Sequence, residues 1–327
     1  MDSIQFILSQ PSWYLLFFIL GILSITRLSL FLLCSIYTFL LRPGKNLHGY
    51  GEWAIVTGPT SGIGQSFAFE LAKNGMNLIL VGRNAEKLDQ VKLEISGLHE
   101  SIKIKTVIFD LSGDSAAGLE RLREAIHGLD VGLLINNAGR AEPSATYFHD
   151  ADIDAWIKMM RVNLDAVVEI THAVLPSMLK KKKGAIVNIG SGSSVVIPSY
   201  PLYATYAATK AFVAQFSQSL YVEYRSKGID VQCQIPLYVA TKVTSGFFKK
   251  KRSSLFLPDS DAYASAAIRC IGYDRISMPN IGHFLQWCFV SWLPDFLNYW
   301  NVLKINVNQR EILKRPREKK NISTTTS

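Results

Sequence analysis

A long apolar stretch opens the chain and is followed by a repeating pattern of short apolar runs. Residues 12–41 contain a single charge, Arg27. A helix that spans a bilayer needs about 20 apolar residues, so this stretch is long enough to cross a membrane. It lacks the small-residue cleavage site that ends a secretory signal peptide. We therefore expect residues 1–45 to form a retained membrane anchor, with a buried helix of a soluble protein as the alternative.

Charges around this stretch indicate how it would sit in a bilayer. An arginine at mid-depth costs about 2.5–3.5 kcal/mol on insertion scales. The span therefore either starts near Ile19, with the Arg27 side chain reaching the interface, or ends near Thr26. Arg42 and Lys45 follow the stretch, whereas Asp2 precedes it. The excess of positive charge on the cytoplasmic side of membrane helices then places the rest of the chain in the cytoplasm.

Beyond residue 50, short apolar runs alternate with helical patterns six times. The runs predict strands at residues 53–57, 77–81, 105–109, 131–135, 185–190 and 229–235. Strands that alternate with helices form a parallel sheet with right-handed crossovers. The pattern therefore predicts one α/β domain over residues 50–285, a doubly wound parallel sheet of Rossmann type. Ligands of such sheets bind beyond the carboxyl ends of the strands.

The C-terminal part is apolar and aromatic, and then basic. Residues 281–303 are rich in Phe, Trp and Tyr, but Pro294 and Asp295 interrupt them. We expect residues 286–327 to form a membrane-associated segment, as an interfacial helix or a helix packed on the anchor, followed by a basic, disordered tail. Residues 237–258 are long, mixed and basic, and predict a lid. Two functions would suit their basic run at 249–252, which are contact with a phosphorylated substrate and contact with the anionic membrane surface. A turn exposed only to solvent is the alternative.

Composition narrows the classes of partner. The 327 residues carry a formal net charge of +9 and are 48% hydrophobic, which favours anionic partners such as lipid or phosphorylated substrates. The lysines fall in short runs without a nucleic-acid motif, so nucleic acid is not expected. The four cysteines form no CxxC pair and the six histidines show no metal-ligand spacing. Reduced thiols and no metal site are the expectation.

Glycines follow the first predicted strand directly. The sequence Thr57-Gly58-x3-Gly62-x-Gly64 lies between that strand and a helical pattern that runs to Lys73. Glycines allow a tight turn and a close approach of the backbone, and the N-terminus of the next helix favours a pyrophosphate. A strand before and a helix after the glycines are the context that a dinucleotide site requires.

The next strand ends place further polar groups at the same edge. Arg83 follows the second strand, where an arginine suits the 2′-phosphate of NADP, although a surface arginine would also fit. Asp110 follows the third strand and either accepts from the adenine amino group or caps the next helix. Asn136 and Asn137 follow the fourth strand and can bond a ligand or neighbouring backbone. Asn163 lies among apolar residues of a helical segment, 150–180, and needs an inward partner.

The last group surrounds the end of the fifth strand and the helix after it. Tyr206 and Lys210 stand four residues apart, so both side chains point the same way on a helix. A nearby ammonium lowers the pKa of a tyrosine, which would make Tyr206 an acid–base group near neutral pH. Ser191, at the strand end, could hold a substrate oxygen beside it. A core tyrosine and an exposed lysine are the alternative.

Together these residues resemble the classical short-chain dehydrogenase/reductase pattern. The resemblance covers about residues 50–285 and rests on the glycine turn, on Asn136-Asn137-Ala138-Gly139, and on Asn163, Ser191 and Tyr206-x3-Lys210. The anchor and the segment 235–242 are similar to membrane-bound very-long-chain 3-oxoacyl-CoA reductases and the related 17-beta-hydroxysteroid dehydrogenases. The family's serine usually lies 13 residues before the tyrosine, which would select Ser193. Matching from the strand end selects Ser191, which we prefer.

The resemblance implies a role for each residue. Tyr206 would protonate the substrate carbonyl, and Lys210 would lower the pKa of Tyr206 and hold the nicotinamide ribose. Ser191 would position the substrate carbonyl. Asn163 would hold a water in a proton relay. The residues implied to contact NADPH are Gly58, Ser61, Ile63, Arg83, Asp110, Asn137, Tyr206, Lys210 and Val239.

The resemblance also implies a function and a place. It implies NADPH-dependent reduction of long-chain 3-oxoacyl-CoA in fatty acid elongation at the endoplasmic reticulum membrane, with the catalytic domain in the cytoplasm. Other elongase subunits would be partners, and a homodimer is one assembly that it allows. The alternatives are a hydroxysteroid or other lipid-ketone dehydrogenase and a non-catalytic subunit of an elongase complex.

Overall fold

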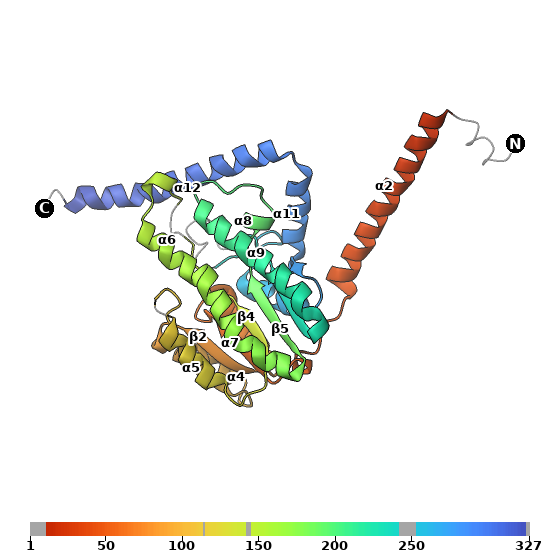
Figure 1. Ribbon diagram of the computed structural model, residues 1–327. Helices are drawn as coiled ribbons and strands as arrows, with labels where there is room; N and C mark the ends of the chain where they lie inside the picture. Colours follow the sequence, from red (N-terminus) through yellow and green to blue (C-terminus); the bar gives the residue numbers. More distant parts are fainter. Residues whose placement is uncertain (1–10, 114, 142–144, 242–252, 325–327) are drawn as a thin grey trace. The chain divides into compact units, whose positions relative to one another are not determined.

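The computed structural model describes residues 11–113, 115–141, 145–241 and 253–324, and the chain divides after Pro43 into two compact units. The first unit is the helix α2 (Ser12–Ile36), which continues into the π-helical turn η1 (Tyr37–Leu41; Figure 1). Residues 13–41 are long and apolar enough to cross a membrane, and none of this stretch is buried. Large side chains such as Phe17 and Leu33 are exposed over 66% and 62% of their surface. The candidate anchor is thus a single apolar helix without a buried residue in residues 13–41, which favours an anchor over a buried helix of a soluble protein.

The second unit is built on a parallel sheet, as the alternation predicted. Its described residues form seven strands in the order β3-β2-β1-β4-β5-β6-β7, with every neighbouring pair parallel. The strands are β1 (Trp53–Thr57), β2 (Asn77–Gly82), β3 (Ile104–Ile108), β4 (Val131–Asn136), β5 (Gly184–Ile189), β6 (Ile229–Gln234) and β7 (Ile276–Ser277). The strand order reverses between β1 and β4, so the doubly wound Rossmann-type fold is confirmed. The two-residue β7 was not predicted, because it is too short to carry an alternating pattern.

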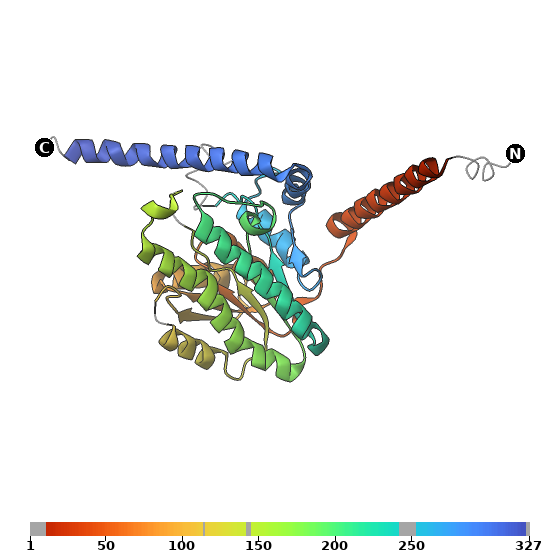
Figure 2. The ribbon, with the colours of Figure 1, turned by 45° about the horizontal axis from the view of Figure 1, so that its top comes forward.

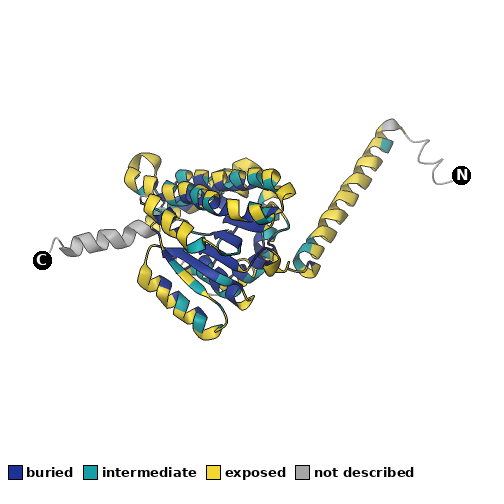
Figure 3. Cartoon of the chain, turned by 60° about the horizontal axis from the view of Figure 1, so that its bottom comes forward, coloured by how far each residue is buried: buried dark blue, intermediate teal, exposed yellow. Residues whose placement is uncertain are grey.

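Helices cover both faces of this sheet, which explains why its central strands β1, β4 and β5 are buried along their whole length. The helices α3 (Gly62–Lys73), α4 (Ala85–Leu98) and α10 (Ser260–Arg269) share one core cluster with the side chains of Ala54 and Val56. The helices α5 (Ala116–Ile126), α7 (Ala166–Lys181) and α9 (Ala204–Tyr224) share the other cluster with Ile55. Figure 3 shows the buried strands between the partly exposed helices.

The predicted helix over 150–180 is broken into parts. It contains the short turn η3 (Phe148–Asp150), the helix α6 (Ile153–Met160), the π-helical turn η4 (Arg161–Asp165) and then α7. After β5 come α8 (Gly192–Val195) and α9, and the turn η5 (Arg225–Lys227) precedes β6. A 3-10 turn, η2 (Leu47–Gly49), precedes β1.

The C-terminal part forms two helices, α11 (Ile281–Trp292) and α12 (Asp295–Thr324), and the break falls at Pro294 as predicted. Figure 2 shows α12 passing over the domain near the start of α6. The expected disordered tail is wrong as far as residue 324, because the backbone stays helical there and Lys, Arg and Glu favour helix. The basic run of the predicted lid, 249–252, lies outside the described residues.

A fully buried histidine joins α11 to the chain after β6. The Nδ1 atom of His283 accepts from the Leu237 amide at 3.3 Å, and its Nε2 atom pairs with the Tyr238 carbonyl at 3.0 Å. Both bonds form when the ring is neutral with its proton on Nε2. Burial lowers the pKa of His283 to about 4, although the bond to the Tyr238 carbonyl acts in the opposite direction. The fold therefore depends on the neutral ring.

This histidine should make the protein less stable in mild acid. Below its ordinary pKa of about 6.5 the unfolded chain binds a proton on His283, whereas the folded chain does not until about pH 4. We expect His283 to remove roughly 2 kcal/mol of unfolding free energy between pH 7 and pH 5. Urea unfolding of wild type and His283→Gln at both pH values measures this, and the variant should lose part of the pH dependence. His127 is exposed, so His127→Gln serves as the control. An equal change of unfolding free energy between pH 7 and pH 5 in all three proteins would contradict the prediction.

Candidate active site

The glycine turn after β1 has no room for larger residues. Gly58 and Gly62 lie in the left-handed region with φ of +65° and +58°. A Cβ atom on Gly64 would lie 2.2 Å from the Nδ2 atom of Asn137 and 2.3 Å from the carbonyl oxygen of Gly58. Ser61 precedes the first turn of α3 without a side-chain capping bond, so the N-terminal amides of α3 are not covered by it. This turn has the features of an anion-binding helix start.

A cleft of about 560 Å³ runs along the carboxyl edge of the sheet beside this turn. It is lined by every residue for which cofactor contact was predicted: Gly58, Ser61, Ile63, Arg83, Asp110, Asn137, Tyr206, Lys210 and Val239. Ser191 and Pro236 line it as well. The structure thus brings together residues from six strand ends that are up to 181 positions apart in the sequence, Gly58 to Val239. Thr60, Arg140 and Thr241 also line the cleft and were not predicted.

Asn137 holds the glycine turn in place. Its Nδ2 atom donates to the carbonyl oxygens of Thr57 at 2.9 Å and Gly58 at 3.2 Å. The Thr57 hydroxyl accepts from the amides of Asn137 at 3.0 Å and Ala138 at 2.9 Å. The sequence left open whether Asn137 bonds a ligand or neighbouring backbone. Its side-chain amide bonds neighbouring backbone, and the residue also lines the cleft.

Asp110 is fixed as an ionised acceptor at the rim. Its Oδ1 atom accepts from the amide of Ser112 at 3.0 Å and from the Ser112 hydroxyl at 2.7 Å. The pKa of Asp110 is lowered, first by the Ser112 amide bond, with smaller contributions from the charges of Arg83 and Arg140. The N-cap residue of α5 is Ser115, so the alternative that Asp110 caps that helix is wrong.

Asn163 is fully buried in η4 and does not line the cleft. Its Oδ1 atom accepts from the Arg140 amide at 2.8 Å, and its Nδ2 atom donates to the Arg140 carbonyl at 2.9 Å and to the Thr209 hydroxyl at 3.0 Å. The side chain therefore ties the loop after β4 to α9. A water relay through Asn163 stays a prediction, and the side-chain amide is already engaged in these bonds.

The structure places Ser191, and not Ser193, against the cleft. Ser191 lies at the end of β5 and caps α8 by accepting from the Ser193 amide at 3.2 Å. A hydrogen bond with Ser191 acts on the hydroxyl of Tyr206. Ser193 is buried behind it, and its hydroxyl donates to that of Ser191 at 3.0 Å. The second serine thus supports the first.

Tyr206 and Lys210 lie one turn apart on α9, as predicted, but their electrostatics differ from the prediction. Burial raises the pKa of Tyr206, the bond with Ser191 opposes this shift, and Tyr238 adds to it. Burial also lowers the pKa of Lys210 to about 8, against a smaller opposite effect from Cys233. The pKa of Tyr206 is therefore raised and not lowered as expected, because desolvation outweighs the bond with Ser191 and the charge of Lys210 is not among the causes of the shift. Tyr206 therefore holds its proton at neutral pH, as a proton donor must.

The ammonium of Lys210 is anchored at the end of β5. Its Nζ atom donates to the Ile189 carbonyl at 2.8 Å, and the side chain is 5% exposed. A Cβ atom on Gly139 would lie 3.4 Å from Nζ, so the glycine leaves the ammonium open toward the cleft. An ammonium has three protons, and the bond to Ile189 uses one of them.

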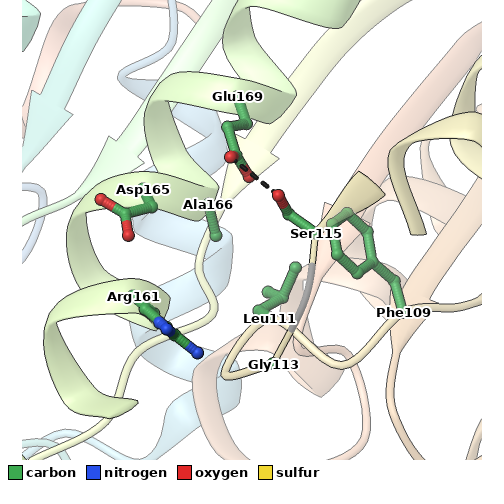
Figure 4. Close-up of a pocket in the computed structure, with 8 residues that line it drawn as sticks. All are labelled: Phe109, Leu111, Gly113, Ser115, Arg161, Asp165, Ala166 and Glu169. Atoms are coloured by element: carbon green, nitrogen blue, oxygen red, sulfur yellow. Dashed lines mark hydrogen bonds between the residues drawn. The ribbon is translucent and has the colours of Figure 1, made fainter. Parts of the chain in front are cut away.

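A smaller pocket of about 300 Å³ adjoins the cleft at Phe109 and Leu111 (Figure 4). It lies between the start of α5 and the segment from η4 into α7. The Ser115 hydroxyl donates to the Glu169 carboxylate at 2.8 Å across it. No sequence pattern pointed to this pocket, because its walls come from separate helices whose faces read as ordinary amphipathic surface.

Comparison with known proteins decides the family. A family model described as short chain dehydrogenase matches residues 52–252. The chain belongs to the short-chain dehydrogenase family. The match contains β1 through β6 and therefore the strand ends that line the cleft of this dehydrogenase. The resemblance inferred from its motifs is confirmed.

Curated relatives of the dehydrogenase are similar over nearly their whole length. It is 47% identical over 308 residues to a very-long-chain 3-oxoacyl-CoA reductase-like protein of Arabidopsis thaliana, with 93% of this chain and 97% of the relative covered. It is 40% identical to the human very-long-chain 3-oxoacyl-CoA reductase, with 80% and 81% covered. It is also 36% identical to the human inactive hydroxysteroid dehydrogenase-like protein 1, with 87% and 88% covered.

Solved structures share the fold. A short-chain dehydrogenase from Sphingobium yanoikuyae in complex with NADPH is 28% identical with a TM-score of 0.62, with 73% of this chain and 92% of that chain covered. A 7beta-hydroxysteroid dehydrogenase, at 22% identity, has a TM-score of 0.70, with 79% and 99% covered. The second likeness concerns the fold alone.

The pKa of Lys210 predicts an alkaline limit for the dehydrogenase. Above about pH 8 the ammonium loses its proton and its charge, whereas Tyr206, with a raised pKa, stays protonated. We expect the rate of ketone reduction to fall above about pH 8, as the pH profile of kcat/KM would show. In Lys210→Arg the guanidinium keeps its charge, so any remaining activity should extend to higher pH. A wild-type profile that stays flat to pH 10 would contradict this assignment.

Proposed function

We propose that this dehydrogenase reduces long-chain 3-oxoacyl-CoA to 3-hydroxyacyl-CoA with NADPH, as a step of very-long-chain fatty acid elongation. The observation that carries the proposal is the meeting of Ser191, Tyr206 and Lys210 with the glycine turn and Arg83 in one cleft. The first three supply carbonyl chemistry, and the last two fit a phosphorylated dinucleotide. The names of the Arabidopsis and human relatives support a thioester substrate.

The cleft fits a nicotinamide dinucleotide. Gly64 has no room for a Cβ atom, so backbone can approach the pyrophosphate closely, and the uncapped start of α3 offers amides to it. Arg83 at the rim supplies a cation for the 2′-phosphate, and Asp110 beside it is an ionised acceptor for the adenine. The residues that would hold NADPH are Gly58, Ser61, Ile63, Arg83, Asp110, Asn137, Tyr206, Lys210 and Val239. The NADPH bound by the Sphingobium relative supports this choice.

The chemistry needs a hydride donor and a proton donor. When bound, the nicotinamide supplies the hydride to C3 of the substrate. Tyr206 donates the proton to the carbonyl oxygen, and its raised pKa means that it gives this proton up to a strong base such as the developing alkoxide. The Ser191 hydroxyl holds the same oxygen. Lys210 holds the ribose through the protons that the Ile189 carbonyl does not take.

We place this activity at the endoplasmic reticulum membrane, with the domain that follows the anchor in the cytoplasm. The exposed apolar helix α2 supports membrane attachment. On α11 and α12 four aromatic side chains, Phe289, Trp292, Phe296 and Trp300, are exposed over 59–83% of their surface. Aromatic side chains favour the membrane interface, which supports contact of residues 286–312 with lipid. Long acyl chains gather at that surface, and other elongase subunits and a second copy of the chain are proposed partners there.

Two observations favour alternatives. The human relative at 36% identity is named a hydroxysteroid dehydrogenase-like protein, which keeps a steroid or another lipid ketone as a second substrate class. The same relative is named inactive, which keeps a non-catalytic elongase subunit as a third candidate. The presence of Ser191, Tyr206 and Lys210 in one cleft supports an active enzyme over the third candidate.

One assay separates the three candidates. The full chain in detergent micelles is mixed with NADPH and either a long-chain 3-oxoacyl-CoA or a 17-ketosteroid, and absorbance follows NADPH oxidation. We expect turnover with the thioester and little with the steroid. Turnover with the steroid alone would support the second candidate, and NADPH binding without any turnover would support the third.

Tyr206→Phe is the matched variant for that assay. It keeps the ring and its packing but lacks the proton, so we expect kcat to fall by about 10²–10⁴-fold with NADPH affinity largely unchanged. Near-normal turnover in this variant would refute the role of Tyr206 as the acid.

Arg83 should determine the choice between NADPH and NADH. A charge-assisted bond to the 2′-phosphate contributes about 1.5–3 kcal/mol, so Arg83→Ala should reduce the preference for NADPH by roughly ten- to hundredfold. The ratio of kcat/KM for the two cofactors measures it. The exposed Arg123→Ala, on α5 away from the cleft, is the control, and an unchanged ratio in Arg83→Ala would contradict the assignment.

A further inference from the structure

One face of α12 packs against the wall of the active site. Leu303 and Val307 pack on a buried cluster of Ala145, Leu202 and Tyr203, and Tyr206 packs on the same cluster. Between them, Asn306 is completely buried. The next asparagine along the helix, Asn308, is exposed. A helix that lies outside the residues matched by the family model thus reaches the surroundings of the proton donor.

Asn306 holds the loop that leads into the catalytic helix. Its Nδ2 atom donates to the Pro201 carbonyl at 2.8 Å. The next carbonyl, of Leu202, accepts from the Thr146 amide at 3.1 Å. Leu202 has φ of +64°, a conformation that side chains other than glycine rarely adopt. Two consecutive carbonyls of a strained turn, those of Pro201 and Leu202, therefore accept hydrogen bonds from Asn306 and Thr146. This turn lies directly before α9, which begins at Ala204.

A second contact fixes α12 on the other side of this loop. The Arg310 guanidinium pairs with the Asp150 carboxylate at 2.8 Å and lies 4.7 Å from the ring centre of Tyr147. Tyr147 and Asp150 directly follow Thr146, whose amide donates to the Leu202 carbonyl. The helix α12 therefore bonds to the 200–203 loop directly and to the segment that supports it.

Stability alone does not explain a buried amide at position 306. Among the described residues the Oδ1 atom of Asn306 has no hydrogen-bond partner, and neither has the nearby buried hydroxyl of Tyr203. A buried polar atom without a partner costs free energy, so a half-satisfied amide between Leu303 and Val307 gains little over an apolar residue. Its one bond, to the loop before Tyr206, is the contribution that a leucine would lack.

We propose that Asn306 is a positioning residue, and that α12 clamps the 200–203 loop so that the Tyr206 hydroxyl faces the substrate carbonyl beside Ser191. This inference rests on the proposed function for its chemistry. A displacement of about 1 Å at a reacting group lowers rates by up to about 10²-fold, which is the scale on which the clamp acts.

The test compares Asn306→Leu with Asn308→Leu in the full chain in detergent. We expect kcat for the 3-oxoacyl-CoA to fall about ten- to hundredfold in Asn306→Leu. NADPH affinity, measured by nicotinamide fluorescence, should stay within twofold, and the melting temperature should stay level or rise. Asn308→Leu should match wild type in all three. A kcat within twofold of wild type in Asn306→Leu would overturn the proposal, and so would parallel losses of kcat, NADPH affinity and melting temperature.

A second variant and a hydrogen-exchange measurement test the clamp independently of Asn306→Leu turnover. Arg310→Gln removes the outer contact and should lower kcat in the same direction by a smaller factor, about threefold. Hydrogen exchange of peptides that cover residues 200–207 needs no turnover, and it should be faster in Asn306→Leu than in Asn308→Leu. Equal exchange in the two variants would overturn the clamp. If wild type reduced no ketone at all, the proposed function would fail, whereas the exchange data would still decide whether α12 holds the loop.

Discussion

The structure depends on the seam between β1 and β4, where the chain reverses the direction in which it builds the sheet. The Thr57 hydroxyl and the Asn137 amide bond four backbone groups across this seam, and Gly64 fits against them only because it lacks a side chain. Each bond contributes about 1 kcal/mol, but a buried partner left without its bond would cost about 1–3 kcal/mol. The seam therefore fixes the glycine turn in one conformation before any ligand arrives.

Buried amides continue this seam toward the catalytic helix. Asn136 bonds Asn188 at 2.8 Å and Thr171 at 3.0 Å, and Asn188 in turn bonds Ser217 on α9 at 2.9 Å. Asn163 adds the bonds to Arg140 and Thr209. Helix α9 is thus tied to β5 at Ser217, and to η4 at Thr209, which lies between Tyr206 and Lys210. These side chains lie in a low-dielectric interior, where such bonds are strong and an unpaired group is costly. Rigid placement of Tyr206 and Lys210 follows from polar groups inside the core, and not from the apolar packing alone.

The sheet and the cleft could be predicted from the sequence, because both follow from local patterns. The strands up to β6 lie in short, mainly apolar runs, and a polar residue or a glycine lies at or within two residues of each strand end. The shared edge then follows from topology. The direction of the pKa shift of Tyr206 could not be predicted, since it is set mainly by desolvation, which depends on parts of the chain far away in the sequence. His283 and Asn306 were also missed. His283 lies in the mainly apolar α11, and Asn306 is one of several asparagines in the largely polar α12. The partner of each lies 46 or 105 positions away in the sequence. Only the tertiary structure shows that they hold Leu237 and Pro201.

The π-helical turn at Arg161–Asp165 determines how this helix responds to the deletion of a residue. An α-helix advances about 100° per residue, and a π turn accommodates one residue more than an α turn. Met159 and Trp156 before the turn, and Val167 and Ile170 after it, all face the interior, and Asn163 faces it as well. Deleting one residue here would be absorbed by converting the π turn into an ordinary α turn, so Trp156 and Ile170 would both stay inward. The turn is thus a place where this helix can lose a residue without turning its buried face outward, at the cost of the bonds that Asn163 makes to Arg140 and Thr209.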